Sequence, residues 1–228
     1  MGGGRTYSWR DGASRALPLA LAVLVDGVAF GVLARAAGLP AVAVLAMSAL
    51  VFSGSAQFAT VSVWAAGGGV APAVTAASLL NVRCIPMGIA AAPALPGRAL
   101  ARLLRAQLVV DESWALAQTA PGRFEPGLLQ GAGALVWVAW LGGTVTGVLG
   151  TGLIDDPRAL GLDGAYPAVF LGLLVPLLEG RGAVVVALLG AAIALLMTPL
   201  LPLGLPLLAS ALVALLAAGS LRQSRPSP

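Results

Sequence analysis

Residues 36–82 read AAGLPAVAVLAMSALVFSGSAQFATVSVWAAGGGVAPAVTAASLLNV, and no acidic or basic side chain occurs between Arg35 and Arg83. A helix needs about 20 apolar residues to cross the hydrocarbon core of a bilayer, so this stretch is long enough for two crossings. The run Gly67-Gly68-Gly69 is a turn signal in its middle. The stretch therefore predicts membrane helices near residues 40–66 and 70–95.

The composition of the whole chain indicates the same class of protein. Of the 228 residues, 59% are hydrophobic and 10% are charged, whereas a soluble domain carries roughly 25% charged residues. Aromatic residues make up only 5%, which favours helices packed through small residues over a β-barrel with aromatic girdles. We therefore expect an all-α, polytopic transmembrane helix bundle in which some helices are broken or re-entrant.

The ionisable residues exclude several classes of function. The chain has no histidine, which removes Ser-His and Cys-His catalysis and every His-ligated metal site. Its 13 basic residues are all arginine and lie mostly between apolar runs, without the basic and aromatic patch of a nucleic-acid-binding protein. Cys84 is the only cysteine, so no intrachain disulfide can form. We expect no enzymatic activity, no metal, no cofactor and no nucleic-acid partner.

Further apolar segments bring the expected number of spans to about seven. They are residues 16–37, 128–154 and 165–178, and two spans that Pro199, Pro202 and Pro206 separate within the uncharged stretch 182–221. We interpret the first as an uncleaved helix and not as a signal peptide. The expected organisation is a single transmembrane domain (1–228) with an N-terminal tail (1–15), an amphipathic polar connector (96–127) and a C-terminal tail (222–228).

The arginines conflict with this count. Arginine-rich loops lie preferentially in the cytoplasm, which would place the N-terminal arginines, the cluster Arg98–Arg105 and the C-terminal tail on one side. Three spans before Pro96 would place that cluster opposite the N-terminus instead. Either one early segment is broken or re-entrant, or the charge rule fails in this chain.

Polar side chains inside apolar segments are candidates for a functional site, because a charge at the centre of a membrane helix costs about 2.5–3.5 kcal/mol on insertion scales. Asp26 lies midway along the first expected span. Its carboxylate could carry a coupling proton or hold a substrate ammonium group. The alternatives are that it pairs with an arginine or caps a broken helix.

Ser53, Gln57 and Thr60 are spaced i, i+4 and i+7, which predicts one polar stripe along the second expected span. Gly54 beside this stripe would let another backbone approach closely. The stripe is a candidate substrate path, although a lone glutamine in a membrane helix can also simply bind neighbouring helices together.

A bend is predicted in the third expected span, where Asn81, Arg83 and Cys84 are followed by Pro86. Proline removes a backbone donor and clashes with the carbonyl group four residues earlier, at Val82. Broken helices often form binding sites in transporters, and a guanidinium can bind a carboxylate through two parallel hydrogen bonds. The alternative is that Arg83 lies at the membrane edge and extends its charge into the headgroup region.

The connector has an amphipathic pattern. Arg98, Arg102 and Arg105 share one helical face. Another face carries Leu100, Leu103, Leu104 and Leu108. This pattern predicts a helix that lies on the membrane or on the protein. The same spacing, continued, places Asp111 on the apolar face and Glu112 on the basic face, where each is a candidate for proton coupling or for an ion pair.

Two pairs of glycines are spaced for close helix packing. Gly27 and Gly31 lie in the first expected span, and Gly143 and Gly147 lie in the fourth. Each pair is followed by a Gly-Leu dipeptide. This is either a weak internal repeat, of the kind found in duplicated transporter halves, or a coincidence in a glycine-rich chain.

Four short segments, in order along the chain, match a known set of motifs. Residues 47–58 (MSALVFSGSAQF) match MS-x-x-VFAG-x-x-QF, and residues 80–83 (LNVR) match the start of LN-x-RH. Residues 110–113 (VDES) match a TDE motif, and residues 160–163 (LGLD), with Pro167 and Phe170 after them, match GLD…P…F. Together these segments resemble the AzlC-type branched-chain amino acid permease family. Four ordered motifs over most of the chain are much more specific than any one of them.

The chain departs from the family pattern at two positions. Cys84 stands where the family has a histidine, and Val110 stands where it has a threonine. If that histidine handles protons in relatives, this protein handles them differently or not at all.

The resemblance implies a secondary exporter of Leu, Ile and Val in the bacterial cytoplasmic membrane, driven by the proton gradient and assembled with a small AzlD-type membrane subunit. The residues expected to hold the zwitterionic substrate are Ser53, Gly54, Gln57, Asn81 and Arg83. The residues available for proton coupling are Asp26, Asp111 and Glu112.

Other functions are compatible with the residues alone. The chain could transport a different small amphipathic substrate. It could be a non-transporting assembly subunit, although a scaffold need not carry the cost of polar groups inside the membrane. Gly54-Ser55 weakly resembles an intramembrane serine protease motif, but without any histidine Ser55 lacks the usual base.

Overall fold

The computed structural model describes residues 7–65, 67–120, 122–153, 171, 174–175, 178, 180–201, 209–210 and 213. The chain divides into two units, one formed by residues 1–58 and 81–166 and the other by residues 59–80 and 167–228. The described elements are helices apart from one short β-hairpin, which confirms the predicted all-α class. The motif at residues 160–170 lies outside the described residues.

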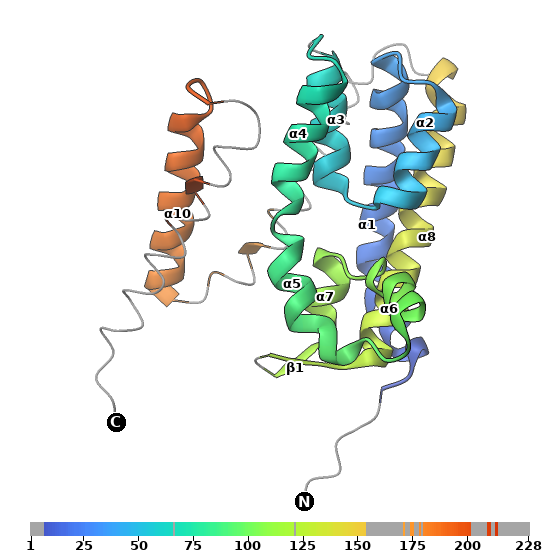
Figure 1. The fold of residues 1–228 in the computed structure, drawn as a ribbon, viewed down its shortest axis with the longest axis vertical. Coiled ribbons are helices and arrows are strands. Elements are labelled where there is room, and N and C mark those ends of the chain that lie inside the picture. The colour runs from blue at the N-terminus through green and yellow to red at the C-terminus, as the bar shows by residue number, and fades with distance from the viewer. Residues whose placement is uncertain are drawn as a thin grey trace, which may run out of the picture. The chain divides into compact units, whose positions relative to one another are not determined.

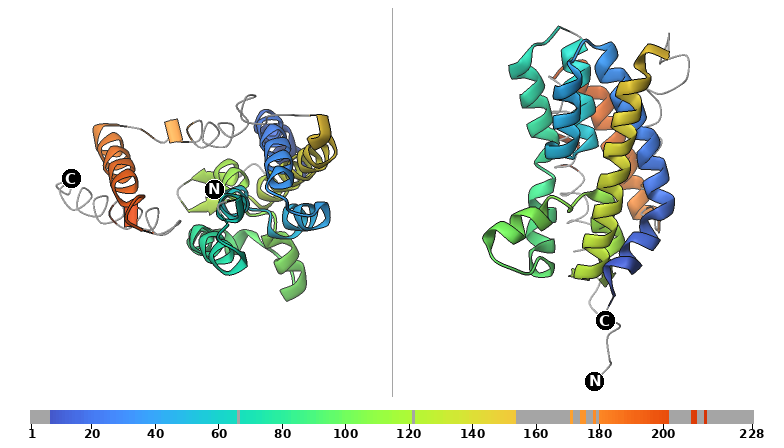
Figure 2. Two further views of the ribbon diagram at one scale, coloured as in Figure 1. Left: turned by 90° about the horizontal axis from the view of Figure 1, so that it is seen from above. Right: turned by 90° about the vertical axis from the view of Figure 1, so that its right-hand side faces the viewer.

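The first unit is built on two long helices that lie side by side, α1 (Trp9–Ala36) and α8 (Pro126–Gly150) (Figures 1 and 2). Gly12 lies against Leu128 near the start of both helices, and Gly31 lies against Thr144 near their ends, so the helices are parallel. A Cβ atom at Gly27 would lie 2.5 Å from the Trp140 carbonyl oxygen. Only glycine fits so close to another backbone, which confirms the predicted packing of the glycine pairs.

The first helix begins earlier than predicted. The Ser8 hydroxyl accepts a hydrogen bond from the Asp11 amide at 3.3 Å, and the Asp11 carboxylate accepts one from the Ser8 amide at 2.7 Å. This reciprocal capping starts α1 at Trp9, so the stretch 1–15 is not all tail.

The predicted span at residues 40–66 is not one continuous helix. Helix α2 (Ala41–Ala46) runs into a π-helical turn, η1 (Met47–Val51), and the turn ends at Phe52, which has a left-handed backbone with φ of 41°. Helix α3 (Gly54–Ala65) then begins and has 12 residues. A helix of that length reaches about 18 Å, well short of the hydrocarbon core of about 30 Å.

The third predicted span is bent, as the sequence indicated. Helix α4 (Val70–Asn81) ends before Val82, and α5 (Cys84–Ala91) begins after Arg83. The axis bends by 41° across this break, and a 3₁₀ turn, η2 (Ala92–Ala94), follows α5. Pro86 lies in the first turn of α5, where its missing N–H group would have had no partner within the helix.

The parallel arrangement of α1 and α8 resolves the conflict over the arginines. Two parallel helices require an odd number of membrane crossings between them. Counted as one span, the bent pair α4–α5 supplies the odd crossing, and the helices of the interrupted segment 40–66 are each too short to supply another. The cluster Arg98–Arg105 therefore returns to the end at which α1 begins, as the charge rule requires.

The expected count of about seven spans is not supported. Among the described residues, three helices are long and apolar enough to cross a membrane, namely α1, α8 and α10 (Gly180–Met197), or four if the bent pair is counted. In the second unit, Val63 of α3 packs with Ala73 and Ala76 of α4.

The connector folds into two short helices and a hairpin. Helix α6 (Ala99–Ala106) has the predicted amphipathic character, with its leucines exposed. Helix α7 (Asp111–Ala117) is followed by the antiparallel strands β1 (Gln118–Ala120) and β2 (Arg123–Phe124). Residues 107–110 are not helical, so helical spacing does not carry over from α6, and the faces predicted for the acidic residues of α7 were wrong.

We expect adjacent glycines of α8 to respond in opposite ways to alanine. Gly143→Ala would place a Cβ atom 2.1 Å from the Leu24 carbonyl oxygen, whereas Gly142→Ala meets no atom within 4 Å. Overpacking costs about 1–3 kcal/mol, so Gly143→Ala should lower the unfolding temperature in detergent. Gly142→Ala should leave it unchanged or raise it slightly. Equal effects of the two substitutions would contradict the contact between α1 and α8.

We also expect the end at which α1 and α8 begin to face the cytoplasm, because described arginines gather there. They lie near the start of α1 (Arg10 and Arg15), in and just before α6 (Arg98, Arg102 and Arg105) and in β2 (Arg123), and Figure 1 shows these elements at that end. In a Cys84→Ser background, a membrane-impermeant maleimide should label Ala36→Cys in intact cells and Ala99→Cys only after permeabilisation. Both positions are exposed. The reverse labelling pattern would show that the charge rule fails here.

Candidate functional site

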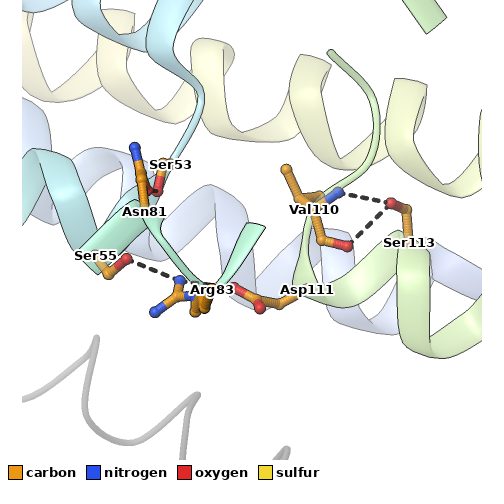
Figure 3. A network of polar contacts seen from close by, with 7 residues as sticks. All are labelled: Ser53, Ser55, Asn81, Arg83, Val110, Asp111 and Ser113. Atoms are coloured by element: carbon orange, nitrogen blue, oxygen red, sulfur yellow. Dashed lines mark hydrogen bonds and ion pairs between the residues drawn. The ribbon is translucent and has the colours of Figure 1, made fainter. Parts of the chain in front are cut away.

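Three interruptions of the helices meet in the first unit (Figure 3). They are the start of α3, the break between α4 and α5, and the start of α7. The Ser53 hydroxyl donates to the Asn81 side-chain oxygen at 2.7 Å. Nη2 of Arg83 donates to the Ser55 hydroxyl oxygen at 2.8 Å and forms an ion pair with Oδ2 of Asp111 at 2.8 Å. These contacts join residues from three separate motifs into one polar cluster.

The ion pair within this cluster is accessible. The side chain of Arg83 is 35% exposed and that of Asp111 is 31% exposed. A partly exposed pair of this kind contributes little to stability. Its position at the ends of two helices, among otherwise apolar segments, makes it a candidate contact for a charged ligand.

The start of α3 adds positive potential at the same place. The first amide groups of a helix have no carbonyl partner within it, and together they carry a partial positive charge. Ser55 lies in this first turn and is buried, and it contacts the Arg83 guanidinium. A helix N-terminus beside an arginine is suited to a carboxylate. Gly54, a predicted site residue, is the first residue of this helix.

The start of α7 is held in place without a side-chain oxygen at position 110. Val110 precedes the helix and cannot cap it, but its amide donates to the Ser113 hydroxyl at 3.0 Å. That hydroxyl in turn donates to the Leu108 carbonyl oxygen at 2.7 Å. Ser113 therefore binds the amide of the residue that precedes the helix, as the third helical residue does in a capping box, and this bond fixes the start of the helix that carries Asp111.

Gln57 belongs to a second, buried network. Its Nε2 donates to the Ser48 hydroxyl at 3.3 Å, and Nε1 of Trp140 donates to the same oxygen at 3.2 Å. The Thr144 hydroxyl donates to the Trp140 carbonyl oxygen at 2.9 Å. Ser48 must therefore donate the bond of 2.8 Å that joins it to Thr144. This network ties the π-helical turn to α8.

The predicted polar stripe keeps its helical spacing at the start of α3, where the Gln57 amide donates to the Ser53 carbonyl oxygen at 2.9 Å, but its side chains bond to different partners. Ser53 bonds to Asn81, whereas Gln57 bonds to Ser48. Oε1 of Gln57 is buried and accepts no hydrogen bond from the described residues. The Gln57 side chain therefore connects α3 to the π-helical turn.

The acidic candidates lie within electrostatic reach of one another. The Glu112 carboxyl group experiences the charges of Asp111, Arg83 and Asp26. Its burial, with a smaller contribution from repulsion by the two aspartates, raises the pKa of Glu112 to about 7. Asp26 is buried in α1, which continues unbroken through it, and no described arginine pairs with it. Neither alternative proposed for Asp26 is found in the described part of the chain.

Sequence reasoning missed some of these residues. Ser55 was considered only as a nucleophile, although it lies in the same motif as Ser53 and could have been predicted as a site residue from that position. Ser48 and Thr144 belong to segments far apart in the chain, and nothing in their local sequence indicated that they would meet.

Comparison with known proteins places this site in a family. The AzlC protein family matches residues 18–154, which include the whole polar cluster. An uncharacterized membrane protein of Archaeoglobus fulgidus is 30% identical over 202 residues, covering 84% of this chain and 85% of the relative. The inner membrane protein YgaZ of Escherichia coli is 25% identical over 199 residues, covering 81% and 80%. No solved structure matches the chain. The chain belongs to the AzlC family of membrane proteins.

Proposed function

We propose that the protein is the large subunit of a secondary exporter of the branched-chain amino acids Leu, Ile and Val. It would act in the bacterial cytoplasmic membrane, use the proton gradient and work with a small AzlD-type membrane subunit. Family membership supports the general role. The observation that carries the proposal is the cluster of Ser55, Arg83 and Asp111 at three interrupted helices.

The cluster has the chemistry that an amino acid carboxylate requires. The Arg83 guanidinium and the first turn of α3 together form a positive site. Irregular backbone is tolerated at membrane depth only where it is enclosed by protein or lines a cavity. Transporters use such interrupted helices to bind charged groups near the centre of the membrane.

Proton coupling would fall to Glu112 and Asp26. A group whose pKa lies near 7 changes its charge within the physiological range, which a coupling residue must do. The two carboxyl groups repel each other when both are ionised, so taking up one proton relieves that repulsion.

The same geometry argues against a serine hydrolase. A nucleophilic serine needs a base that accepts its proton. The described side chain that contacts the Ser55 hydroxyl is the Arg83 guanidinium, which donates a hydrogen bond to it and cannot accept a proton.

We expect Arg83 to be essential for transport in liposomes that contain this chain and its small partner. Arg83→Lys removes the planar guanidinium, and Arg83→Gln removes the charge. Loss of a hydrogen bond to a charged group should lower leucine counterflow about 10- to 100-fold. The matched control is Arg102→Lys on the exposed helix α6, which should retain the wild-type rate. Wild-type counterflow in both Arg83 variants would support the non-transporting subunit instead.

We expect leucine transport to depend on pH through Glu112. The Glu112 carboxyl group is neutral below about pH 7 and ionised above it. Leucine counterflow should therefore change across this range in the wild type. Glu112→Gln fixes the neutral form, so counterflow should become independent of pH and proton-driven accumulation should be lost.

The control for this experiment is Glu125→Gln, because Glu125 forms no side-chain cap to α8. It should retain the wild-type pH profile. An unchanged profile in Glu112→Gln would exclude Glu112 as the coupling group.

A further inference from the structure

We infer that an amino acid zwitterion binds by inserting into the Arg83–Asp111 ion pair, so that its carboxylate contacts Arg83 and its ammonium group contacts Asp111. The inference rests on the proposed function and specifies how the substrate is recognised. It assigns Asp111 to the ammonium group of the substrate and leaves proton coupling to other carboxylates.

Charge balance supports insertion. The pair joins one guanidinium to one carboxylate at 2.8 Å, and a zwitterion likewise carries one charge of each sign. Insertion replaces one ion contact with two, and the net charge of the site is unchanged. A ligand with only one charge would break the contact between Arg83 and Asp111 and replace it with one contact instead of two.

The two side chains are positioned independently of each other. When Asp111 is released, the Arg83 guanidinium keeps its hydrogen bond to Ser55. Asp111 is the first residue of α7, and Ser113 fixes the start of that helix through Val110. The ion pair can therefore separate while both side chains stay in position. An ion pair that only held the two helices together would not need this property.

The position of Asp111 also favours this role. A carboxylate in the first turn of a helix is stabilised by the partial positive charge of that turn. Asp111 can therefore stay ionised while its contact passes from Arg83 to an ammonium group. Both members of the pair are about one-third exposed, so a ligand can reach them.

The test compares leucine with two analogues, 4-methylpentanoate, which lacks the ammonium group, and 3-methylbutylamine, which lacks the carboxylate. Binding is measured by competition with radiolabelled leucine on the purified two-chain complex. In the wild type, each analogue should bind about 10- to 100-fold more weakly than leucine.

Neutralising one partner should change this preference in a defined direction. Asp111→Asn should weaken leucine and bring 4-methylpentanoate to within about threefold of it, since the amide no longer attracts an ammonium group. Arg83→Gln should weaken leucine binding and bring the affinity for 3-methylbutylamine to within about threefold of that for leucine. The control Glu125→Gln should keep the wild-type ratios.

The outcomes separate the inference from the proposed function. If the wild type binds leucine but 4-methylpentanoate competes equally well, or if Asp111→Asn keeps the wild-type ratio, the inference is wrong and the exporter proposal stands. If the wild type binds a different amino acid, the branched-chain assignment fails. The insertion is then tested by comparing that amino acid with its analogue that lacks the ammonium group. If the folded complex binds no amino acid, both proposals fail.

Discussion

The backbone contact between α1 and α8 is the constraint on which the rest of the first unit depends. Glycine brings the two helices so close that a Cβ atom at Gly143 would lie 2.1 Å from the Leu24 carbonyl oxygen. Because the helices are also parallel, the chain between them must cross the membrane an odd number of times. The interrupted segment at residues 40–66 follows from this requirement, since one of the two apolar stretches before Pro96 cannot be a full crossing. The fold of the early chain is thus set by a contact with a helix that comes a hundred residues later.

The functional cluster arises where regular structure stops. Within a membrane, an interruption exposes polar backbone that must be enclosed. Here the starts of α3 and α7 and the break before α5 are gathered together, so that polar side chains and helix ends satisfy one another. Arg83 connects all three elements. The same arrangement that makes the interruptions tolerable also creates a site with a positive and a negative partner, which is what a zwitterion requires.

The sequence predicted the features that have a local cause. Paired glycines indicated close packing, Pro86 indicated a bend beside Arg83, and the Arg and Leu spacing indicated the amphipathic helix α6. The predicted faces of Asp111 and Glu112 were wrong, because they extended the helical pattern of α6 through residues 107–110, which are not helical. The interruption before Ser53 was not predicted either, since Phe52 carries no local signal that it ends a helix. Ser53 and Gln57 keep helical spacing after this interruption, but their side chains bond to different segments, which spacing alone cannot predict.

Phe52 is the one non-glycine residue with positive φ in the described part of the chain. Such a conformation costs of order 1–3 kcal/mol, and two side-chain hydrogen bonds reach the residues just before it. Trp137 donates to the Ala49 carbonyl oxygen at 3.3 Å, and Gln107 donates to the Leu50 carbonyl oxygen at 2.9 Å. The tip of the interrupted segment is therefore anchored at two adjacent carbonyl groups, one to α8 and one to the connector, so the position of this left-handed residue depends on two elements far from it in the chain.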